Sequence, residues 1–148
     1  MTRLEVPLAY RKLQTTGDLV VHAELILAIK TERGAWEPFP FLVDSGTEMT
    51  TMPACEAKHQ NLPIPKTPIP GLAFQASEIR SGLLRAQIPG MDTTEYLFPC
   101  YFVGDPNSRQ VRARNLLGLT GVINQIRLIF DGASSRVAPR GILIVEKR

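Results

Sequence analysis

Residues 19–30 alternate along the chain in the way that is typical of a half-buried β-strand. One face of this predicted strand carries a row of apolar side chains, which are Val21, Ala23, Leu25, Leu27 and Ile29. Further strands are predicted over residues 39–43, 49–53, 95–103, 128–130 and 141–145. Residues 72–78 and 79–88 have the pattern of the two arms of a hairpin. The chain is therefore expected to be mostly β.

Prolines and short polar turns separate these segments and leave little room for helices. The 12 prolines are scattered along the chain, and residues 61–71 hold several of them in near-alternate places, which predicts an extended edge segment or loop. One short helix is predicted from Pro53 to about His59. A second is predicted after Thr120 or Gly121, and its inner face would carry Val122, Ile123 and Ile126. The fold class is all-β with one or two short helices, in a single domain that spans residues 1–148.

Composition fits one globular domain and leaves the nature of a partner open. The chain has 148 residues, of which 44% are hydrophobic and 21% charged, which argues against a disordered tail or a coiled coil. The net charge of +3 is uneven, because residues 103–148 are basic and the rest is slightly acidic. A small basic β-barrel that binds nucleic acid is one alternative. Since the arginines are dispersed and no aromatic residues alternate with them, a solvated basic face is favoured and no nucleic-acid partner is expected.

Cysteine and histidine positions do not predict a metal site. Cys55 and Cys100 lack ligand spacing, so both are expected to be reduced thiols, and neither a metal nor another cofactor is expected. His22 and His59 are expected to be solvated. The longest apolar run, Leu25 to Ile29, is far too short to span a membrane, and no secretory signal is recognised. A cytoplasmic location is the default expectation.

Chemistry is concentrated in the stretch Phe41-Leu42-Val43-Asp44-Ser45-Gly46-Thr47, in which an apolar strand delivers an acid into a tight turn. About 70 residues downstream, Leu116-Leu117-Gly118 is an apolar pair that ends in glycine. This ordered pair of motifs resembles the signature of aspartic proteases, and the chain length resembles the single-lobe members, the retropepsins. The resemblance spans roughly residues 19 to 145. It implies an acid-protease barrel, closed or partly open, with one lobe per chain.

The same resemblance assigns roles to the motif residues. Asp44 would be the catalytic carboxyl, and Ser45 would hydrogen-bond across a twofold axis. Gly46 would let the backbone approach substrate, and Thr47 would support the carboxylate through its hydroxyl. Leu116, Leu117 and Gly118 would pack behind the loop as a scaffold. The family's flap, a hairpin that closes over substrate, would correspond to the segment from Gly71 to Ile88, with substrate contacts from Leu72, Ala73, Phe74 and Gln75. The strand at the terminus resembles the dimer-forming strand of the family.

A single Asp-Ser-Gly motif sets a requirement on assembly. Asp18, Asp92, Asp105 and Asp131 do not repeat the motif, and 148 residues do not suffice for two lobes. Two aspartates close together share one proton and act as base and acid, so two copies must meet at a twofold axis, each contributing Asp44. The partners expected are therefore a second copy of the chain and a peptide or protein substrate.

The function favoured is an aspartic endopeptidase, a hydrolase that cleaves peptide bonds with an activated water. Its activity is expected at acidic to near-neutral pH, because hydrolysis falls once both carboxyls ionise. One alternative is the same fold kept as a peptide-binding or dimerisation module with poor catalysis. For Asp44 itself, the alternative is an ordinary turn residue that caps a loop.

Overall fold

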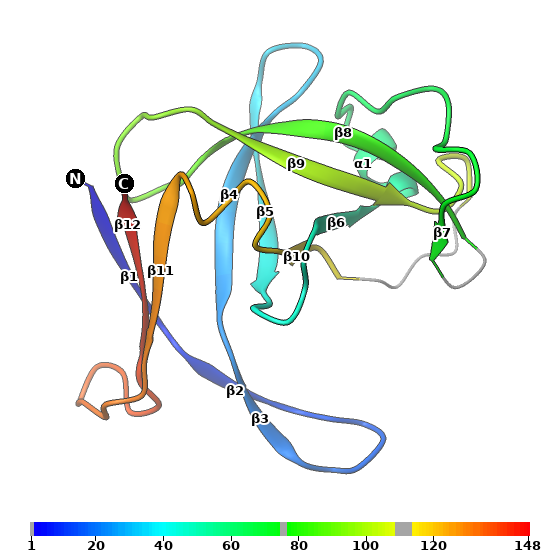
Figure 1. Cartoon of the computed structure of the whole chain (residues 1–148). Helices are drawn as coiled ribbons and strands as arrows, with labels where there is room; N and C mark the ends of the chain where they lie inside the picture. Colours follow the sequence, from blue (N-terminus) through cyan, green and yellow to red (C-terminus); the bar gives the residue numbers. More distant parts are fainter. Residues whose placement is uncertain (1, 75–76, 109–113) are drawn as a thin grey trace.

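The computed structural model describes residues 2–74, 77–108 and 114–148 of the chain (Figure 1). Across these residues the chain forms twelve strands and one short helix. In chain order they are β1 (Arg3–Pro7), β2 (Ala9–Lys12), β3 (Leu19–His22), β4 (Glu24–Lys30), β5 (Trp36–Val43), β6 (Thr50–Pro53), α1 (Ala54–His59), β7 (Ala73–Phe74), β8 (Ser77–Gln87), β9 (Tyr96–Val103), β10 (Leu116–Leu117), β11 (Ile126–Asp131) and β12 (Ile142–Lys147). The prediction of a mostly β domain is confirmed.

The largest sheet has the strand order β4-β5-β10-β6-β9-β8-β7, and β8 pairs a second time with β4. This second pairing, Ala28 with Gln87 and Ile29 with Ala86, brings the two sides of the sheet together. Alternation along β4 and β9 places one face of each strand in the core, as period-two patterning predicts. The largest side chains that are fully buried include Phe41, Phe98 and Phe102. Figure 1 shows β8 and β9 crossing over the shorter strands that lie beneath them.

Two prolines interrupt the edge of β5 that faces β10. Leu42 N donates to Asn115 O at 2.9 Å, so the even-numbered backbone groups of β5 point to the side on which β10 lies. The next two even positions along that edge are Pro40 and Pro38, which have no N–H to donate. The carbonyl of Pro40 accepts from Asn115 Nδ2 at 3.1 Å. The sequence thereby limits pairing on this edge to the end of β5 that leads into Asp44.

A separate three-stranded sheet has the order β1-β12-β11, with both pairings antiparallel (Figure 1). One face packs on the core through Leu143 and Val145, which are inaccessible to solvent. Strand β12 is paired on both edges by strands of its own chain. The terminal strand, which resembles the family's dimer-forming strand in sequence position, thus has both of its hydrogen-bonding edges occupied within one copy of the chain.

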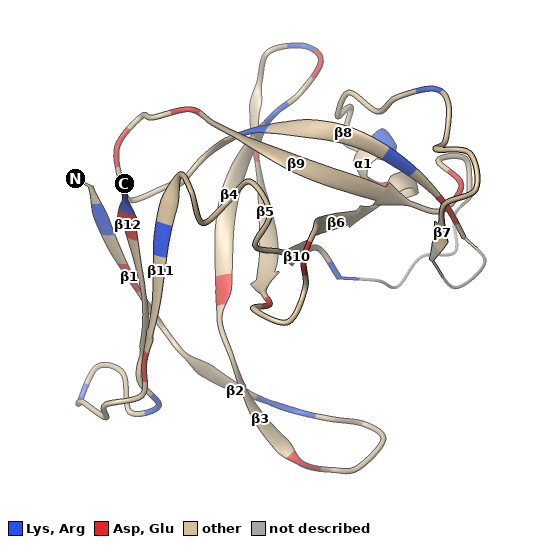
Figure 2. Ribbon diagram, viewed as in Figure 1, with Lys and Arg blue, Asp and Glu red and all other residues tan. Residues whose placement is uncertain are grey.

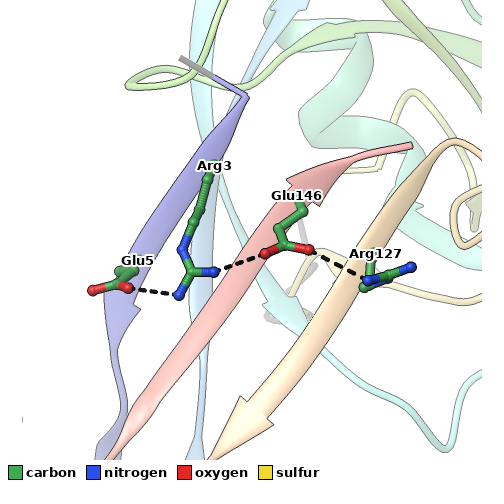
Figure 3. Close-up of polar contacts among 4 residues, drawn as sticks. All are labelled: Arg3, Glu5, Arg127 and Glu146. Carbon is green, nitrogen blue, oxygen red and sulfur yellow. Dashed lines mark hydrogen bonds and ion pairs between the residues drawn. The ribbon is translucent and has the colours of Figure 1, made fainter.

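The outer face of this sheet carries a ladder of charges (Figure 3). Glu146 on β12 accepts from Arg3 on β1 at 2.8 Å and forms an ion pair with Arg127 on β11 at 3.7 Å. Arg3 also contacts Glu5 at 2.9 Å. The side chains of Arg3 and Arg127 are 50% and 56% exposed, so solvent screens these pairs strongly.

Several predicted elements need correction. Residues 19–30 form two strands, and Val21, predicted to be buried, is 52% exposed because β2 and β3 project as a hairpin beyond the core (Figure 1). The segment after Gly118 makes successive turns instead of a helix, with Val122 N donating to Leu119 O and Ile126 N to Val122 O. Within these turns Val122 and Ile126 are buried, whereas Ile123 is 46% exposed. Strands β1 and β2 were not predicted.

We predict that packing, and not the charge ladder, holds the terminal sheet in place. Leu143→Ala should lower the free energy of unfolding by about 2–5 kcal/mol, because it removes a fully buried side chain. Glu146→Gln should lower it by less than about 1 kcal/mol, since its partners are exposed. Urea unfolding followed by circular dichroism measures both. A Glu146→Gln loss as large as that of Leu143→Ala would contradict this assignment.

Candidate active site

Asp44 lies at the point where β5 leaves the core. Val43 N donates to Ala23 O on one side at 2.9 Å, and Asp44 N donates to Leu117 O on the other at 3.1 Å. Phe41 and Val43 are buried, so the two preceding odd-numbered side chains fix the strand in the core. The backbone of Asp44 is consequently held between two neighbouring segments before the chain turns away.

Strand β10 passes between the two strands that flank the Asp44 loop. It runs parallel to β5, pairing Leu116 with Leu42, and antiparallel to β6, pairing Leu116 with Thr51. The loop from Asp44 to Met49 therefore connects two strands that are separated by a third. Beyond β10, Leu119 N donates to Thr47 O at 3.1 Å and Thr120 N donates to Glu48 O at 2.8 Å, which ties the loop to the turn that follows.

Gly118 allows the chain after β10 to pass close to the backbone of the segment that leads into β6. A Cβ atom at this position would lie 2.5 Å from the carbonyl carbon of Met49 and 2.8 Å from the backbone nitrogen of Thr50. Gly118 N donates to the hydroxyl of Thr50 at 3.1 Å, and Thr50 is fully buried. The glycine of the Leu-Leu-Gly motif is therefore required by backbone approach, and not by an unusual φ angle.

The carboxylate of Asp44 is held at both oxygens. Gly46 N donates to Oδ1 at 2.9 Å, and the hydroxyl of Thr47 donates to Oδ2 at 2.8 Å. A Cβ at Gly46 would lie 3.3 Å from Oδ1, a tight contact that glycine avoids. Together these contacts give the carboxylate one orientation.

A turn made by an aspartate is by itself not distinctive in this chain. Asp92, Asp105 and Asp131 each accept from the backbone N–H two residues on, as Asp44 does. Asp44 differs because its other oxygen binds the hydroxyl of Thr47 and because its backbone is held by β10. The turn interpretation therefore describes the local geometry, and the threaded loop sets Asp44 apart.

Asp44 faces an open groove, called here the Asp44 groove, with a volume of about 650 Å³. Its walls come from the β2–β3 hairpin, the end of β5 and the segments on either side of the β11–β12 turn. Apart from Leu42 to Ser45, the lining includes Tyr10, Arg11, Val20, His22, Phe130 and Arg140. In Figure 1 the β2–β3 hairpin lies below the end of β5, and the turn between β11 and β12 lies at the lower left.

The structure places Ser45 in the groove beside Asp44 and the Leu116-Leu117-Gly118 segment beside the Asp44 loop. Ser45 is exposed and lines the Asp44 groove, next to Asp44 and the Gly46-Thr47 turn. Leu117 is fully buried beside the loop, and its carbonyl accepts from Asp44 N. The Leu116-Leu117-Gly118 segment thus lies directly against the Asp44 loop.

The predicted flap forms a hairpin, but its described residues do not reach the groove. Ala73 pairs with Glu78, and Phe74 pairs with Ser77 in the β7–β8 hairpin. Leu72 is 38% exposed, and Gln75 lies outside the described residues. The Asp44 groove is lined by none of the described residues of this hairpin.

Reasoning from the sequence missed the groove wall. His22, expected to be solvated, is half-buried and lines the groove, and its Nδ1 is buried without a hydrogen-bond partner in the described structure. Arg11, Phe130 and Arg140 were not singled out. Their positions carry no local motif, because chain segments more than a hundred residues apart build this wall.

A larger groove, of about 1210 Å³, lies between the open edge of β5 and α1. It contains Cys55 and His59, one helical turn apart, together with Asn115. Both cysteines are free thiols, and burial raises the pKa of Cys100. Within the described residues no hydrogen bond joins Cys55 to His59, so this groove lacks the nucleophile–base contact that a cysteine hydrolase needs. Size alone does not outweigh the organised carboxylate of the Asp44 groove.

Comparison with known proteins supports the fold. No protein-family model and no curated protein matches the chain. Among solved structures, the chain is similar to the crystal structure of a retropepsin-like aspartic protease from Rickettsia conorii, with a TM-score of 0.58 and 12% sequence identity over 98% of this chain and 90% of that chain. At this identity the similarity establishes a shared fold and leaves activity to be tested. In the part of the chain described, no helix is long and apolar enough to cross a membrane.

We predict that Gly118→Ala destabilises the protein by about 1–3 kcal/mol or more, because the added methyl meets backbone atoms that cannot rotate away. Gly132→Ala is the matched control, since a Cβ there meets nothing within 4 Å, and it should change stability by less than about 0.5 kcal/mol. Chemical denaturation compares the two variants. Equal stability of both would show that β10 does not pass as closely as described.

Proposed function

We propose that this chain is an aspartic endopeptidase that works as a homodimer, with one Asp44 from each copy. The observation that carries the proposal is the loop threaded by β10, in which Gly46 N and the Thr47 hydroxyl fix the Asp44 carboxylate at the floor of a groove. The fold shared with a retropepsin-like aspartic protease is consistent with it.

Two carboxyls at the axis would hydrolyse a peptide bond without a covalent intermediate. The ionised carboxylate takes a proton from a water molecule as its oxygen attacks the peptide carbonyl, and the protonated carboxyl gives its proton to the carbonyl oxygen. The gem-diol intermediate then collapses. The carboxyl that took the proton from water gives it to the amide nitrogen, the other carboxylate takes a proton from a diol hydroxyl, and the C–N bond breaks. Base and acid exchange roles, so the pair is ready for another cycle.

The surroundings of Asp44 suit this arrangement. Ser45 is exposed beside Asp44, where its hydroxyl would meet the facing loop of a second copy. A carboxylate pinned by its own loop does not need to reorganise when the second copy arrives. Substrate would lie extended in the groove, with its backbone pairing with strand edges. The β7–β8 hairpin would cover it as a flap after movement or across the dimer.

Asp44→Asn should abolish peptide cleavage, lowering kcat by at least about 10³-fold, because an amide can neither take a proton from water nor share one with its twin. The fold should persist, since the amide oxygen can still accept from Gly46 N. The control is Asp105→Asn, which alters an aspartate with the same turn geometry. A library of unstructured peptides read by mass spectrometry measures cleavage. If Asp44→Asn cleaves as well as the parent, the proposal is wrong. If the parent and the Asp44→Asn variant both bind peptide but cleave none, the chain is a binding module.

Activity should depend on dimer formation. Specific activity should rise with protein concentration over the range in which sedimentation velocity detects the change from monomer to dimer, because a single copy has only one carboxyl of the pair. Full activity of a strictly monomeric protein would contradict the twofold site.

A further inference from the structure

The Asp44 groove is unusual in its balance of charge. Arg11 on β2 and Arg140 before β12 both line it, and Asp44 is its only carboxylate among the described lining residues. Figure 2 shows basic positions in β2 and in the loop between β11 and β12, both in the lower half of the view. Within the described structure no ion pair joins Asp44 to either arginine. The groove therefore has two cationic side chains whose charge no carboxylate of its wall neutralises.

Neither cation is paired elsewhere. Among the described residues, ion pairs engage Arg3, Arg80, Arg85 and Arg127, but not Arg11 or Arg140. The Nε of Arg11 is buried and has no hydrogen-bond partner in the described structure. Buried donors in native proteins nearly always have an acceptor, so this one calls for an explanation. The most direct explanation is an acceptor that belongs to a ligand.

The strand register places Arg11 beside His22. In the β2–β3 hairpin Arg11 pairs with Val20 and Ala9 pairs with His22, so Arg11 and His22 lie on the same face. That face is half-buried at Arg11, Val20 and His22, whereas Tyr10 and Val21 on the opposite face are 49% and 52% exposed, although they line the groove as well. Arg140 packs over the ring of Tyr10, with its guanidinium carbon 4.8 Å from the ring centroid, and therefore lies beside a different face of the hairpin from Arg11.

We propose that this groove selects substrates that carry an acidic side chain close to the scissile bond, and that Arg11 is the residue that reads it; the inference rests on the proposed peptidase function. A carboxylate accepts two parallel hydrogen bonds from a guanidinium, which would satisfy the orphaned Nε–H of Arg11. Arg140, which lies over the ring of Tyr10 in the same groove, would add electrostatic attraction for the acidic side chain. Val20 and Phe130 supply apolar surface for the stem of a glutamate side chain. A lysine or arginine at the same place in the substrate would meet like charge and be rejected.

Matched peptides test this selection. Starting from any sequence that the protein cleaves, the residues within two positions of the scissile bond are changed in turn to Glu, Gln and Lys. At one of these positions kcat/KM should be at least about tenfold higher for Glu than for its isostere Gln, and lower still for Lys. Arg11→Gln should remove the preference for Glu over Gln, and Arg11→Glu should reverse it towards Lys.

The control variant is Arg33→Gln, an exposed arginine in the turn between β4 and β5, outside the groove, which should keep the parent preference. Binding of the same peptides to the Asp44→Asn variant, measured by fluorescence anisotropy, gives a readout that does not require cleavage. It should rank Glu above Gln and Lys.

The outcomes separate the two proposals. Cleavage with no charge preference at any position, or a preference that survives Arg11→Gln, overturns the assignment of Arg11 and leaves the peptidase intact. Cleavage of no peptide overturns the peptidase, whereas a Glu preference in binding alone would still support an acidic ligand for the groove. If Arg11→Gln abolishes the dimer in sedimentation velocity, Arg11 serves the subunit contact and the inference is wrong.

Discussion

The structure depends on one close approach, that of Gly118 to the backbone of Met49 and Thr50. Gly118 follows β10 where that strand has passed between β5 and β6, and position 118 has no room for a side chain. Because β10 lies there, Leu117 O is available to Asp44 N, and the turn that follows can bind the carbonyls of Thr47 and Glu48. The Asp44 loop is thereby fixed at its base and along its length. The orientation of the carboxylate follows from this backbone constraint, with the Gly46 and Thr47 contacts as its last step.

The rest of the fold builds the walls of the Asp44 groove beside this loop. The β2–β3 hairpin and the end of β11 build walls on one side of Asp44, and the groove stays open on the other. Strand β12 is saturated by β1 and β11, so a second copy cannot add to it as a strand. Each of β1 and β11 keeps one edge unpaired within the described structure, and the ends of β11 and of the Asp44 loop meet in the same groove.

Local signals predicted most of the strands and the Asp44 loop, but not the groove. Alternation over residues 24–30 and 96–103 is a period-two pattern that the core enforces, so those strands were predictable. The Asp44 and Leu-Leu-Gly motifs are local as well. Val21 was misplaced because alternation continues past Ala23 although the chain leaves the core there. The short strands β1 and β2 gave too few periods to be recognised. Arg11 and Arg140 come to line the same groove only through tertiary structure, and no spacing in the sequence encodes this placement.

The two unpaired arginines are best understood together with the loop. A buried guanidinium N–H without an acceptor weakens the folded state, because the N–H group loses water and gains nothing in return. Arg80, 8% exposed, avoids this cost because it binds Glu78 at 2.7 Å and also contacts Gly104 O. In the described structure, buried oxygens of Tyr96 and Asn115, both outside the Asp44 groove, also have no hydrogen-bond partner. Exceptions to local consistency gather at functional sites, where a ligand completes what the protein leaves open. Because the unpartnered N–H of Arg11 lies in the groove of Asp44, the charge recognition and the hydrolysis proposed above would share one site.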